Sequence, residues 1–257
     1  MSPFIDLTGK LIVVAGASSG IGEETARQVA ELGAKVVLLA RREEKLKAIV
    51  TSLPGEGHAY YGADFSNLGS IEPLVKTIVV ENGAIDGLVY SAGISQNYPL
   101  KSLVPEKVQA VFAINYFGFL EIARQVTRRK NFNKGLSIVG LSSIAAVSGS
   151  KAHTLYSSSK SAMNGAVRCI ARELADKGVR ANVVVPGMTD TVMYKDFLTA
   201  YGEDSDTKRK LLERQYLGIC SVSSVASTIA FLLSERARFI TGQEIPVDGG
   251  MLSSTGM

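Results

Sequence analysis

Short apolar runs alternate with longer segments of helical periodicity along the chain. The apolar runs are rich in β-branched residues and occupy residues 11–16, 35–40, 59–64, 87–91, 136–141, 181–185 and 244–247. Amphipathic helices are predicted between them, at residues 21–32, 43–52, 68–82, 105–128, 156–177 and 224–233. Strands that alternate with helices in this way form a parallel sheet covered on both faces. The pattern therefore predicts an α/β fold with one doubly wound, seven-stranded parallel sheet.

The stretch from residue 188 to residue 219 departs from this alternation, because about thirty residues separate a predicted strand from the next predicted helix. Long insertions after the carboxyl end of a strand often carry binding residues. We therefore interpret 188–219 as a substrate-lid insertion, with helical portions around residues 207–216. No repeat, low-complexity tract or linker rich in Pro, Gly or Ser divides the chain. We expect residues 1–257 to form a single domain.

Composition argues against several other classes of protein. Hydrophobic residues make up 46% of the 257 residues, enough for a sizeable core, and 28 Lys and Arg against 24 Asp and Glu give a net charge of +4. The densest basic clusters, at 128–130 and 208–210, are short, so nucleic-acid binding ranks last among our hypotheses. No apolar run reaches membrane-spanning length, and the start of the chain lacks a signal-peptide pattern. We expect a soluble, cytoplasmic protein with no membrane partner.

The cysteine and histidine content predicts neither a disulfide framework nor a metal site. Cys169 and Cys220 are too few and too far apart in the sequence for either. His58 belongs to a polar turn, and neither it nor His153 has cysteines or paired carboxylates beside it. His153 precedes Tyr156 by three residues and is assigned no role.

A glycine-rich turn joins the first predicted strand to the first predicted helix. It reads Gly-Ala-Ser-Ser-Gly-Ile-Gly over residues 16–22. Glycines allow the backbone to approach a phosphate closely, and the free N–H groups of a helix N-terminus favour its negative charge. The spacing differs from the common G-x-G-x-x-G fingerprint, so a turn without a ligand stays open as the alternative. The residues that we expect to hold the diphosphate of a dinucleotide are Gly16, Ser18, Ser19, Gly20, Ile21 and Gly22.

The end of the second strand predicts which dinucleotide is bound. NAD enzymes usually place an acidic residue there to accept hydrogen bonds from the ribose 2′-hydroxyl. This chain has Ala40 followed by Arg41 and Arg42, and a guanidinium presents a planar fork of donors suited to a 2′-phosphate. The alternative is that both arginines open the next helix and pair with Glu43 and Glu44. We predict NADP(H), with Arg41 the stronger candidate for the 2′-phosphate.

Tyr156 and Lys160 form the candidate catalytic pair. Their i, i+4 spacing places a phenol and an ammonium on one face of the predicted helix. A tyrosine with a pKa near its reference value of about 10 is a poor acid or base at neutral pH, and a nearby lysine charge lowers that pKa. Taken alone the pair is a weak signal, because many helices carry both residues on their surface.

The order of the motifs strengthens this signal. Five features follow one another along the chain: the glycine turn, a helix with Asn115, a strand that ends in Ser142-Ser143, the Tyr-Lys helix and Pro186-Gly187. Together they resemble the short-chain dehydrogenase/reductase family, from residues 9–10 to the closing segment 241–250. The resemblance implies a Rossmann-type fold and an NADP(H)-dependent oxidoreductase that acts on CH–OH groups and the corresponding carbonyls.

The resemblance implies a role for each member of the catalytic group. Tyr156 gives a proton to the reacting oxygen or takes one from it, while hydride passes to or from the nicotinamide. Lys160 lowers the pKa of the tyrosine and holds the ribose hydroxyls. Ser143, thirteen residues before Tyr156, hydrogen-bonds the substrate oxygen, and Ser142 is the weaker candidate. Asn115 keeps a water in a proton relay behind the lysine, its alternative being an ordinary helix kink or surface amide.

The same resemblance assigns cofactor contacts to Tyr156 and Lys160 and to further residues. Asp64 matches the family position that contacts the adenine. Ser91, Ala92 and Gly93 match the stretch beside the cofactor, and Pro186, Gly187 and Thr191 match the segment that holds the nicotinamide carboxamide. Two departures concern support of the loops, since Ala15 stands where a threonine is common and Ser91 stands where an asparagine is common.

The leading functional hypothesis is an NADP(H)-dependent oxidoreductase acting on a carbonyl or secondary alcohol of a small molecule. A 3-oxoacyl thioester (acyl-carrier-protein) reductase is one alternative, and hydroxysteroid, sugar and polyol substrates are equally open. A non-catalytic NADP(H)-binding sensor is another, opposed by the presence of Ser143, Tyr156 and Lys160. Family members commonly form homodimers or homotetramers through the helices at 105–128 and 156–177, and we predict a tetramer.

Overall fold

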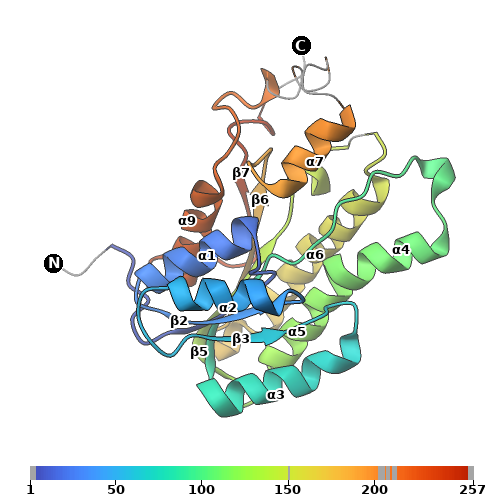
Figure 1. Ribbon diagram of the computed structural model, residues 1–257. Helices are drawn as coiled ribbons and strands as arrows, with labels where there is room; N and C mark the ends of the chain where they lie inside the picture. Colours follow the sequence, from blue (N-terminus) through green and yellow to red (C-terminus); the bar gives the residue numbers. More distant parts are fainter. Residues whose placement is uncertain (1–3, 150, 202–205, 207–208, 210–212, 254–257) are drawn as a thin grey trace.

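One parallel sheet of seven strands organises the protein, seen here in a computed structural model that describes residues 4–149, 151–201, 206, 209 and 213–253 (Figure 1). The strands lie in the order β3-β2-β1-β4-β5-β6-β7. Their bounds are β1 (Leu11–Ala15), β2 (Lys35–Ala40), β3 (Ala59–Gly62), β4 (Ile85–Tyr90), β5 (Phe132–Leu141), β6 (Arg180–Pro186) and β7 (Glu244–Val247). The predicted doubly wound Rossmann-type α/β fold is confirmed.

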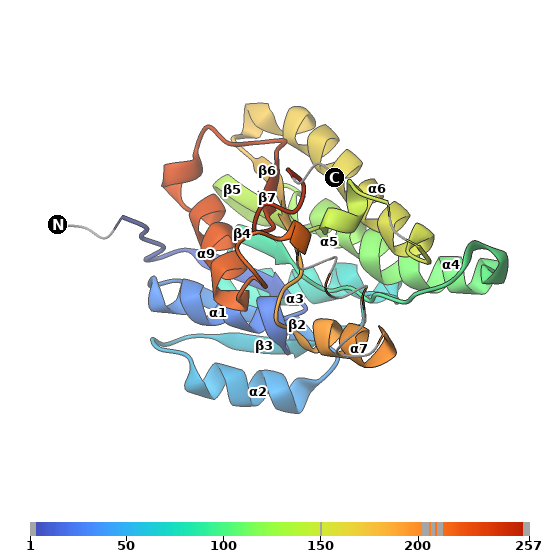
Figure 2. The same ribbon diagram turned by 90° about the horizontal axis from the view of Figure 1, so that it is seen from above.

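Helices cover both faces of this sheet (Figure 2). Their bounds are α1 (Gly20–Glu31), α2 (Glu43–Ser52), α3 (Ile71–Asn82), α4 (Pro105–Phe112), α5 (Gly118–Val126), α6 (Thr154–Glu173), α7 (Val192–Tyr201) and α9 (Val222–Leu233). Successive side chains of a strand point to opposite faces. In β1, Val13 therefore joins the core under α3, α5 and α6, whereas Val14 joins the core under α1, α2 and α9.

The strand order reverses direction at β1, because β2 and β3 lie on one side of it and β4 to β7 lie on the other. Open α/β sheets bind their ligands outside the carboxyl ends of the strands at such a switch point. Gly16 follows β1 and Ser91 follows β4, and these two strands are direct neighbours. The topology therefore places the glycine turn and the segment after β4 at the same edge, where a binding crevice is expected.

The helix predicted at 105–128 is interrupted. It consists of α4, a π-helical turn η3 (Ala113–Phe117) and α5. A π turn breaks the regular ladder of backbone hydrogen bonds and is frequent at functional sites. The Ile114 carbonyl within it accepts a 2.5 Å hydrogen bond from the buried Tyr90 hydroxyl of β4. Asn115 lies inside this turn and is fully buried, so its surface-amide alternative is wrong.

Other element boundaries differ by a few residues from the prediction. β3 ends at Gly62, two residues earlier than predicted, so Asp64 lies in the turn that follows. β5 begins at Phe132, four residues earlier than predicted, because the exposed residues Asn133 and Lys134 near its start hide the apolar pattern of a strand. Within 188–219 the helix α7 was not predicted. The helix expected around residues 207–216 falls largely outside the described residues; residues 213 and 214 are helical.

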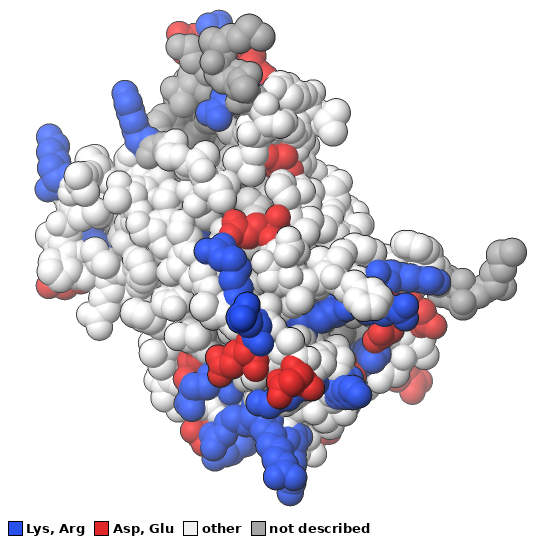
Figure 3. Space-filling view, turned by 180° about the vertical axis from the view of Figure 1, so that it is seen from behind, with Lys and Arg blue, Asp and Glu red and all other residues white. Residues whose placement is uncertain are grey.

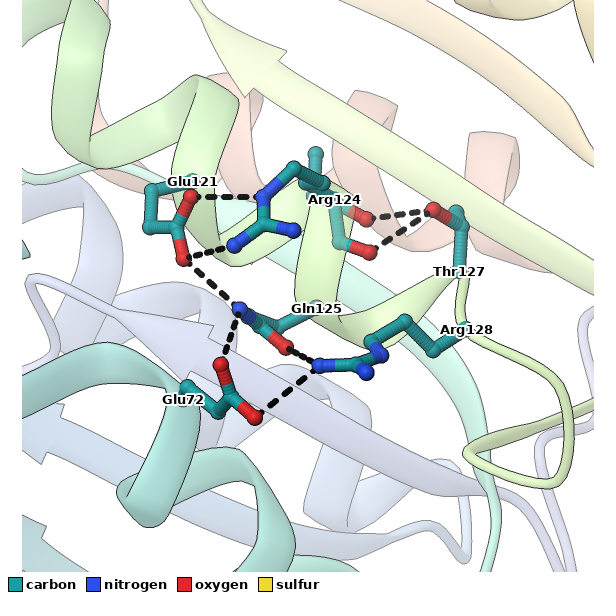
Figure 4. Close-up of polar contacts among 7 residues, drawn as sticks. Glu72, Glu121, Arg124, Gln125, Thr127 and Arg128 are labelled. Carbon is teal, nitrogen blue, oxygen red and sulfur yellow. Dashed lines mark hydrogen bonds and ion pairs between the residues drawn. The ribbon is translucent and has the colours of Figure 1, made fainter. Parts of the chain in front are cut away.

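A polar network ties α5 to α3 (Figure 4). The buried Gln125 side chain donates hydrogen bonds to Glu121, at 2.7 Å, and to Glu72 of α3, at 3.4 Å. Arg128 donates to Glu72 at 3.0 Å and to the side-chain Oε1 atom of Gln125 at 3.1 Å. The first arginine of the basic cluster at 128–130 thus takes part in helix packing.

The charged surface carries both signs. On the face opposite the view of Figure 1, Lys and Arg side chains gather toward the lower end, with Asp and Glu side chains among them (Figure 3). Across the part of the chain that is described, no helix combines the length and apolar character that crossing a membrane requires. The described residues likewise contain no group of three or more His, Cys, Asp and Glu side chains suited to a metal ion.

Candidate active site

The glycine turn packs directly against the segment that follows β4. Gly16 has a φ of +84°, and a Cβ there would lie 2.4 Å from the Ala92 nitrogen. A Cβ on Gly22 would lie 2.3 Å from both the Gly16 oxygen and the Ser91 hydroxyl oxygen. Only glycine fits either position without displacing backbone. The Ser91 hydroxyl donates to the Ala15 carbonyl at 2.9 Å, so the serine that replaces the usual asparagine still fixes this loop.

Gly20 is in a different environment. It has a φ of +60° and begins α1, and within 4 Å a Cβ there would meet only the Thr191 side chain, at 3.6 Å from Cγ2. Thr191 immediately precedes α7. The N-termini of α1 and α7 therefore lie close together, and helix N-termini present free N–H groups that favour an anion.

Arg42 contacts the glycine turn. Its Nη2 atom lies 2.8 Å from the Ser18 hydroxyl oxygen and 2.9 Å from that of Ser19, and donates a hydrogen bond to each. Arg41 is exposed, and its charge contributes to holding the pKa of Asp64 below the usual range, after the larger effect of hydrogen bonds from Ser66. The geometry therefore joins Arg42, rather than the sequence-favoured Arg41, to the expected phosphate loop.

Ser143, Tyr156 and Lys160 come together at the carboxyl end of β5. Tyr156 lies in the first turn of α6 and is half-buried, whereas Lys160 is only 3% exposed and donates a 2.7 Å hydrogen bond to the Leu141 carbonyl. The Lys160 Nζ lies 5.9 Å from the centre of the Tyr156 ring. Ser143 lies two residues after the end of β5 and hydrogen-bonds the Tyr156 hydroxyl. The three residues form one polar group at the expected crevice.

Burial has the largest effect on the pKa of both members of the Tyr-Lys pair. It raises the pKa of Tyr156, and the hydrogen bond with Ser143 opposes that rise without reversing it. It also lowers the pKa of Lys160 to about 8. Burial therefore opposes the lowered tyrosine pKa that the resemblance implies, because removal of the phenolate from water outweighs the hydrogen bond with Ser143.

Asn115 links the segment after β4 to α6. Its Oδ1 atom accepts from the Ile94 nitrogen at 2.8 Å, and its Nδ2 atom donates to the Ile94 carbonyl at 2.9 Å and to the Ser159 hydroxyl at 3.0 Å. Gly93 lies between Asn115 and Lys160, since a Cβ there would be 3.3 Å from Asn115 Oδ1 and 3.2 Å from Lys160 Nζ. These contacts fix the backbone beside the lysine.

The two serines at the end of β5 point to different surroundings. Ser142 is buried and donates a 2.6 Å hydrogen bond to Asn164 Oδ1, and Asn164 in turn donates to Glu244 of β7. Ser142 is thus part of the sheet-to-helix packing, whereas Ser143 faces the tyrosine. The ring of His153 lies 6.3 Å from that of Tyr156, edge-on, and its Nδ1 is 3.0 Å from the Lys151 carbonyl.

A residue that the sequence did not single out supports the segment after β6. Gln215 is 1% exposed; its Oε1 atom accepts from the Met188 nitrogen at 2.9 Å and its Nε2 atom donates to the Met188 carbonyl at 3.0 Å. A Cβ on Gly187 would lie 2.7 Å from the same Oε1. Thr189 pairs with Cys220 as a parallel bridge, so both ends of the 188–219 segment meet. Such long-range contacts leave no local pattern in the sequence.

This chain is similar over nearly its whole length to a known protein family and to characterised relatives. A family model described as enoyl-(acyl carrier protein) reductase matches residues 16–252. The L-xylulose reductase of Caenorhabditis elegans is 35% identical over 250 residues, which cover 95% of this chain and 96% of that protein.

Two solved structures share both the fold and sequence similarity. A short-chain dehydrogenase/reductase of Brucella melitensis, described as a glucose/ribitol dehydrogenase, is 32% identical with a TM-score of 0.87 and covers 96% of this chain and 98% of its own. A gluconate 5-dehydrogenase of Burkholderia cenocepacia, in complex with NADP and tartrate, is 26% identical with a TM-score of 0.89 and covers 97% and 98%.

Proposed function

This chain belongs to the short-chain dehydrogenase/reductase family of oxidoreductases, and from that premise we propose that it transfers a hydride between NADP(H) and a carbonyl or secondary alcohol of a small molecule. The observation that carries the proposal is the convergence of Ser143, Tyr156 and Lys160 at the carboxyl edge of the sheet. A sensor that only binds the cofactor has no need for this group of side chains.

The residues around the glycine turn fit a dinucleotide phosphate. Gly16 and Gly22 bring the turn against the segment after β4, while a side chain at Gly20 would meet only Thr191. Arg42 sits on the turn and Arg41 follows β2, so two guanidinium groups lie where a 2′-phosphate is expected. The NADP-bound gluconate 5-dehydrogenase, which has the same fold, supports this choice of cofactor.

In the direction of reduction, the proposed roles follow from protonation states. Bound NADPH supplies the hydride. Tyr156, whose pKa is raised, is protonated at neutral pH and can donate its proton to the carbonyl oxygen. Ser143 hydrogen-bonds the same oxygen as negative charge develops on it. Lys160, charged below a pKa of about 8, stabilises the phenolate that remains.

Asn115 supports this group from behind. Both Nδ2 hydrogens are used, by the Ile94 carbonyl and the Ser159 hydroxyl. The water of the proton relay that the resemblance places at Asn115 would therefore not be held by these two side-chain donors.

The substrate class is proposed from relatives and tested directly. The L-xylulose reductase and the gluconate 5-dehydrogenase are named for polyhydroxylated substrates, which makes keto sugars the first class to assay. The alternative is a 3-oxoacyl thioester, favoured by the acyl-carrier-protein description of the family model. We propose that residues 188–219 border the substrate.

The test is NADPH consumption, with NADH in parallel, across keto sugars, acyl thioesters, steroids and simple ketones. Turnover that prefers NADPH supports the proposal, and the accepted compound identifies the class. Tight NADPH binding without turnover of any compound would favour the sensor instead.

We further propose a single-domain, cytoplasmic enzyme that forms a homotetramer or homodimer through α4, α5 and α6. Val108, Phe117 and Leu120 are exposed apolar residues along α4, η3 and α5, and burial against a second copy would remove them from water. Light scattering at micromolar concentration tests this, since a monomer contradicts it.

A further inference from the structure

Tyr194 carries a buried hydroxyl without a hydrogen-bond partner. The residue is 8% exposed, and among the described residues nothing hydrogen-bonds its hydroxyl oxygen. A buried polar group that leaves water without gaining a partner costs free energy. Such groups in a folded protein call for an explanation, and a bound ligand is one.

The position of Tyr194 relates it to the glycine turn. It lies in the first turn of α7, three residues after Thr191, and residues at this spacing share one helix face. Thr191 is the residue that faces Gly20 at the start of α1. The residues between them are exposed, Val192 by 63% and Met193 by 43%. Thr191 and Tyr194 therefore share the less exposed face of this turn, and Thr191 on that face lies against Gly20 at the N-terminus of α1.

The surroundings suit an anion that accepts hydrogen bonds. The N-termini of α1 and α7 meet here, and the first N–H groups of a helix have no partner within the helix, which favours an anion. The pKa of Tyr194 is raised, first by burial and then by the Asp190 carboxylate, so its hydroxyl stays protonated and acts as a donor. A phosphate oxygen accepts such a bond.

We propose that the Tyr194 hydroxyl donates a hydrogen bond to the diphosphate of the dinucleotide cofactor. This inference rests on the proposed function and adds a contact from α7 to those of the glycine turn. It also gives the first turn of α7 a direct part in holding the cofactor, alongside Thr191.

The test compares two ligands on three proteins by isothermal titration calorimetry. The proteins are the wild type, Tyr194→Phe, which removes only the hydroxyl, and Tyr216→Phe, a control at a tyrosine that is 63% exposed in the same segment. The ligands are NADPH and adenosine 2′-monophosphate, which has the 2′-phosphate but no diphosphate. Melting temperatures are recorded for all three proteins.

The expected result is NADPH binding about tenfold weaker in Tyr194→Phe, as for loss of a hydrogen bond to a charged group. Adenosine 2′-monophosphate should bind all three proteins equally, and Tyr216→Phe should bind NADPH like the wild type. Unchanged NADPH affinity in Tyr194→Phe overturns the inference. Equal losses for both ligands also overturn it, because they indicate a structural role. A wild type that binds neither ligand refutes the proposed cofactor itself, which is a separate result.

Discussion

The Lys160 ammonium lies 5.9 Å from the centre of the Tyr156 ring, one turn further along α6, and is held there by the Leu141 carbonyl. The bond to Leu141 orients the lysine from the end of β5, so strand and helix position the pair together. A charge this deeply buried is unfavourable for folding. The position of Lys160 beside the candidate catalytic tyrosine therefore lowers the free energy of unfolding, and this effect can be measured.

Lys160→Met should change how stability depends on pH. Burial lowers the pKa of Lys160 from its ordinary value of 10.5 to about 8, so the folded protein holds fewer protons than the unfolded chain between these values. Below pH 8 the wild type carries the full free-energy cost of burying the Lys160 charge. This cost decreases as the pH rises toward 10.5, because the lysine is then neutral in the folded and in the unfolded chain. The free energy of unfolding of the variant, relative to wild type, should fall by about 3 kcal/mol between pH 8 and pH 10.5.

Urea unfolding at several pH values measures this difference. Lys45→Met is the matched control, because that lysine is exposed on α2. A difference between Lys160→Met and wild type that stays constant across the range contradicts the assigned burial penalty.

Asn115→Ala should destabilise the protein strongly. The substitution leaves the Ile94 backbone and the Ser159 hydroxyl without their buried partner, and we expect a loss of about 3 kcal/mol in the free energy of unfolding. Asn133→Ala removes an exposed amide that also hydrogen-bonds, and it should cost much less. Similar losses in the two variants contradict the account of Asn115 as a buried anchor.

Arg42→Ala should lower the preference for NADPH over NADH. Arg42 hydrogen-bonds Ser18 and Ser19, and removal of its guanidinium should weaken NADPH binding about tenfold while NADH binding changes little. Arg41→Ala is the comparison, titrated by cofactor fluorescence in the same way. If only Arg41→Ala loses the preference, the 2′-phosphate belongs to Arg41, as the sequence alone suggested.

Gln215→Glu should lower the melting temperature, because a carboxylate cannot donate to the Met188 carbonyl and would be repelled by it. A loss of about 2 kcal/mol is expected. Gln243→Glu is the control at an exposed glutamine. Equal melting temperatures of the two variants would show that the Gln215 contacts do not hold this segment.

The sheet could be predicted because its strands are short, apolar and separated by helices with clear periodicity. The order of β1 and β4 brings Gly16 and Ser91 together, two residues that the sequence motifs assign to the cofactor without predicting the strand order. Tyr156 and Lys160 could be paired because i, i+4 spacing on a helix fixes their relative position.

The remaining features depend on contacts between distant segments. The Asn115 side chain in the π turn bonds Ile94 and Ser159, and no local periodicity indicates these contacts. The bond between Gln215 and Met188 joins residues distant in the sequence, and the burial of the Tyr194 hydroxyl likewise depends on the folded chain. The pKa of Tyr156 is likewise set by burial, which depends on the whole fold.

The central claim is that Tyr156 is the acid and base of an NADP(H)-dependent reaction, and one measurement tests it most directly. NADPH consumption with an accepted carbonyl substrate is compared between the wild type and Tyr156→Phe, together with NADPH affinity. We predict turnover reduced at least about 100-fold, as for loss of a general acid, with NADPH affinity unchanged within about twofold. Turnover within about threefold of wild type in Tyr156→Phe would contradict the account.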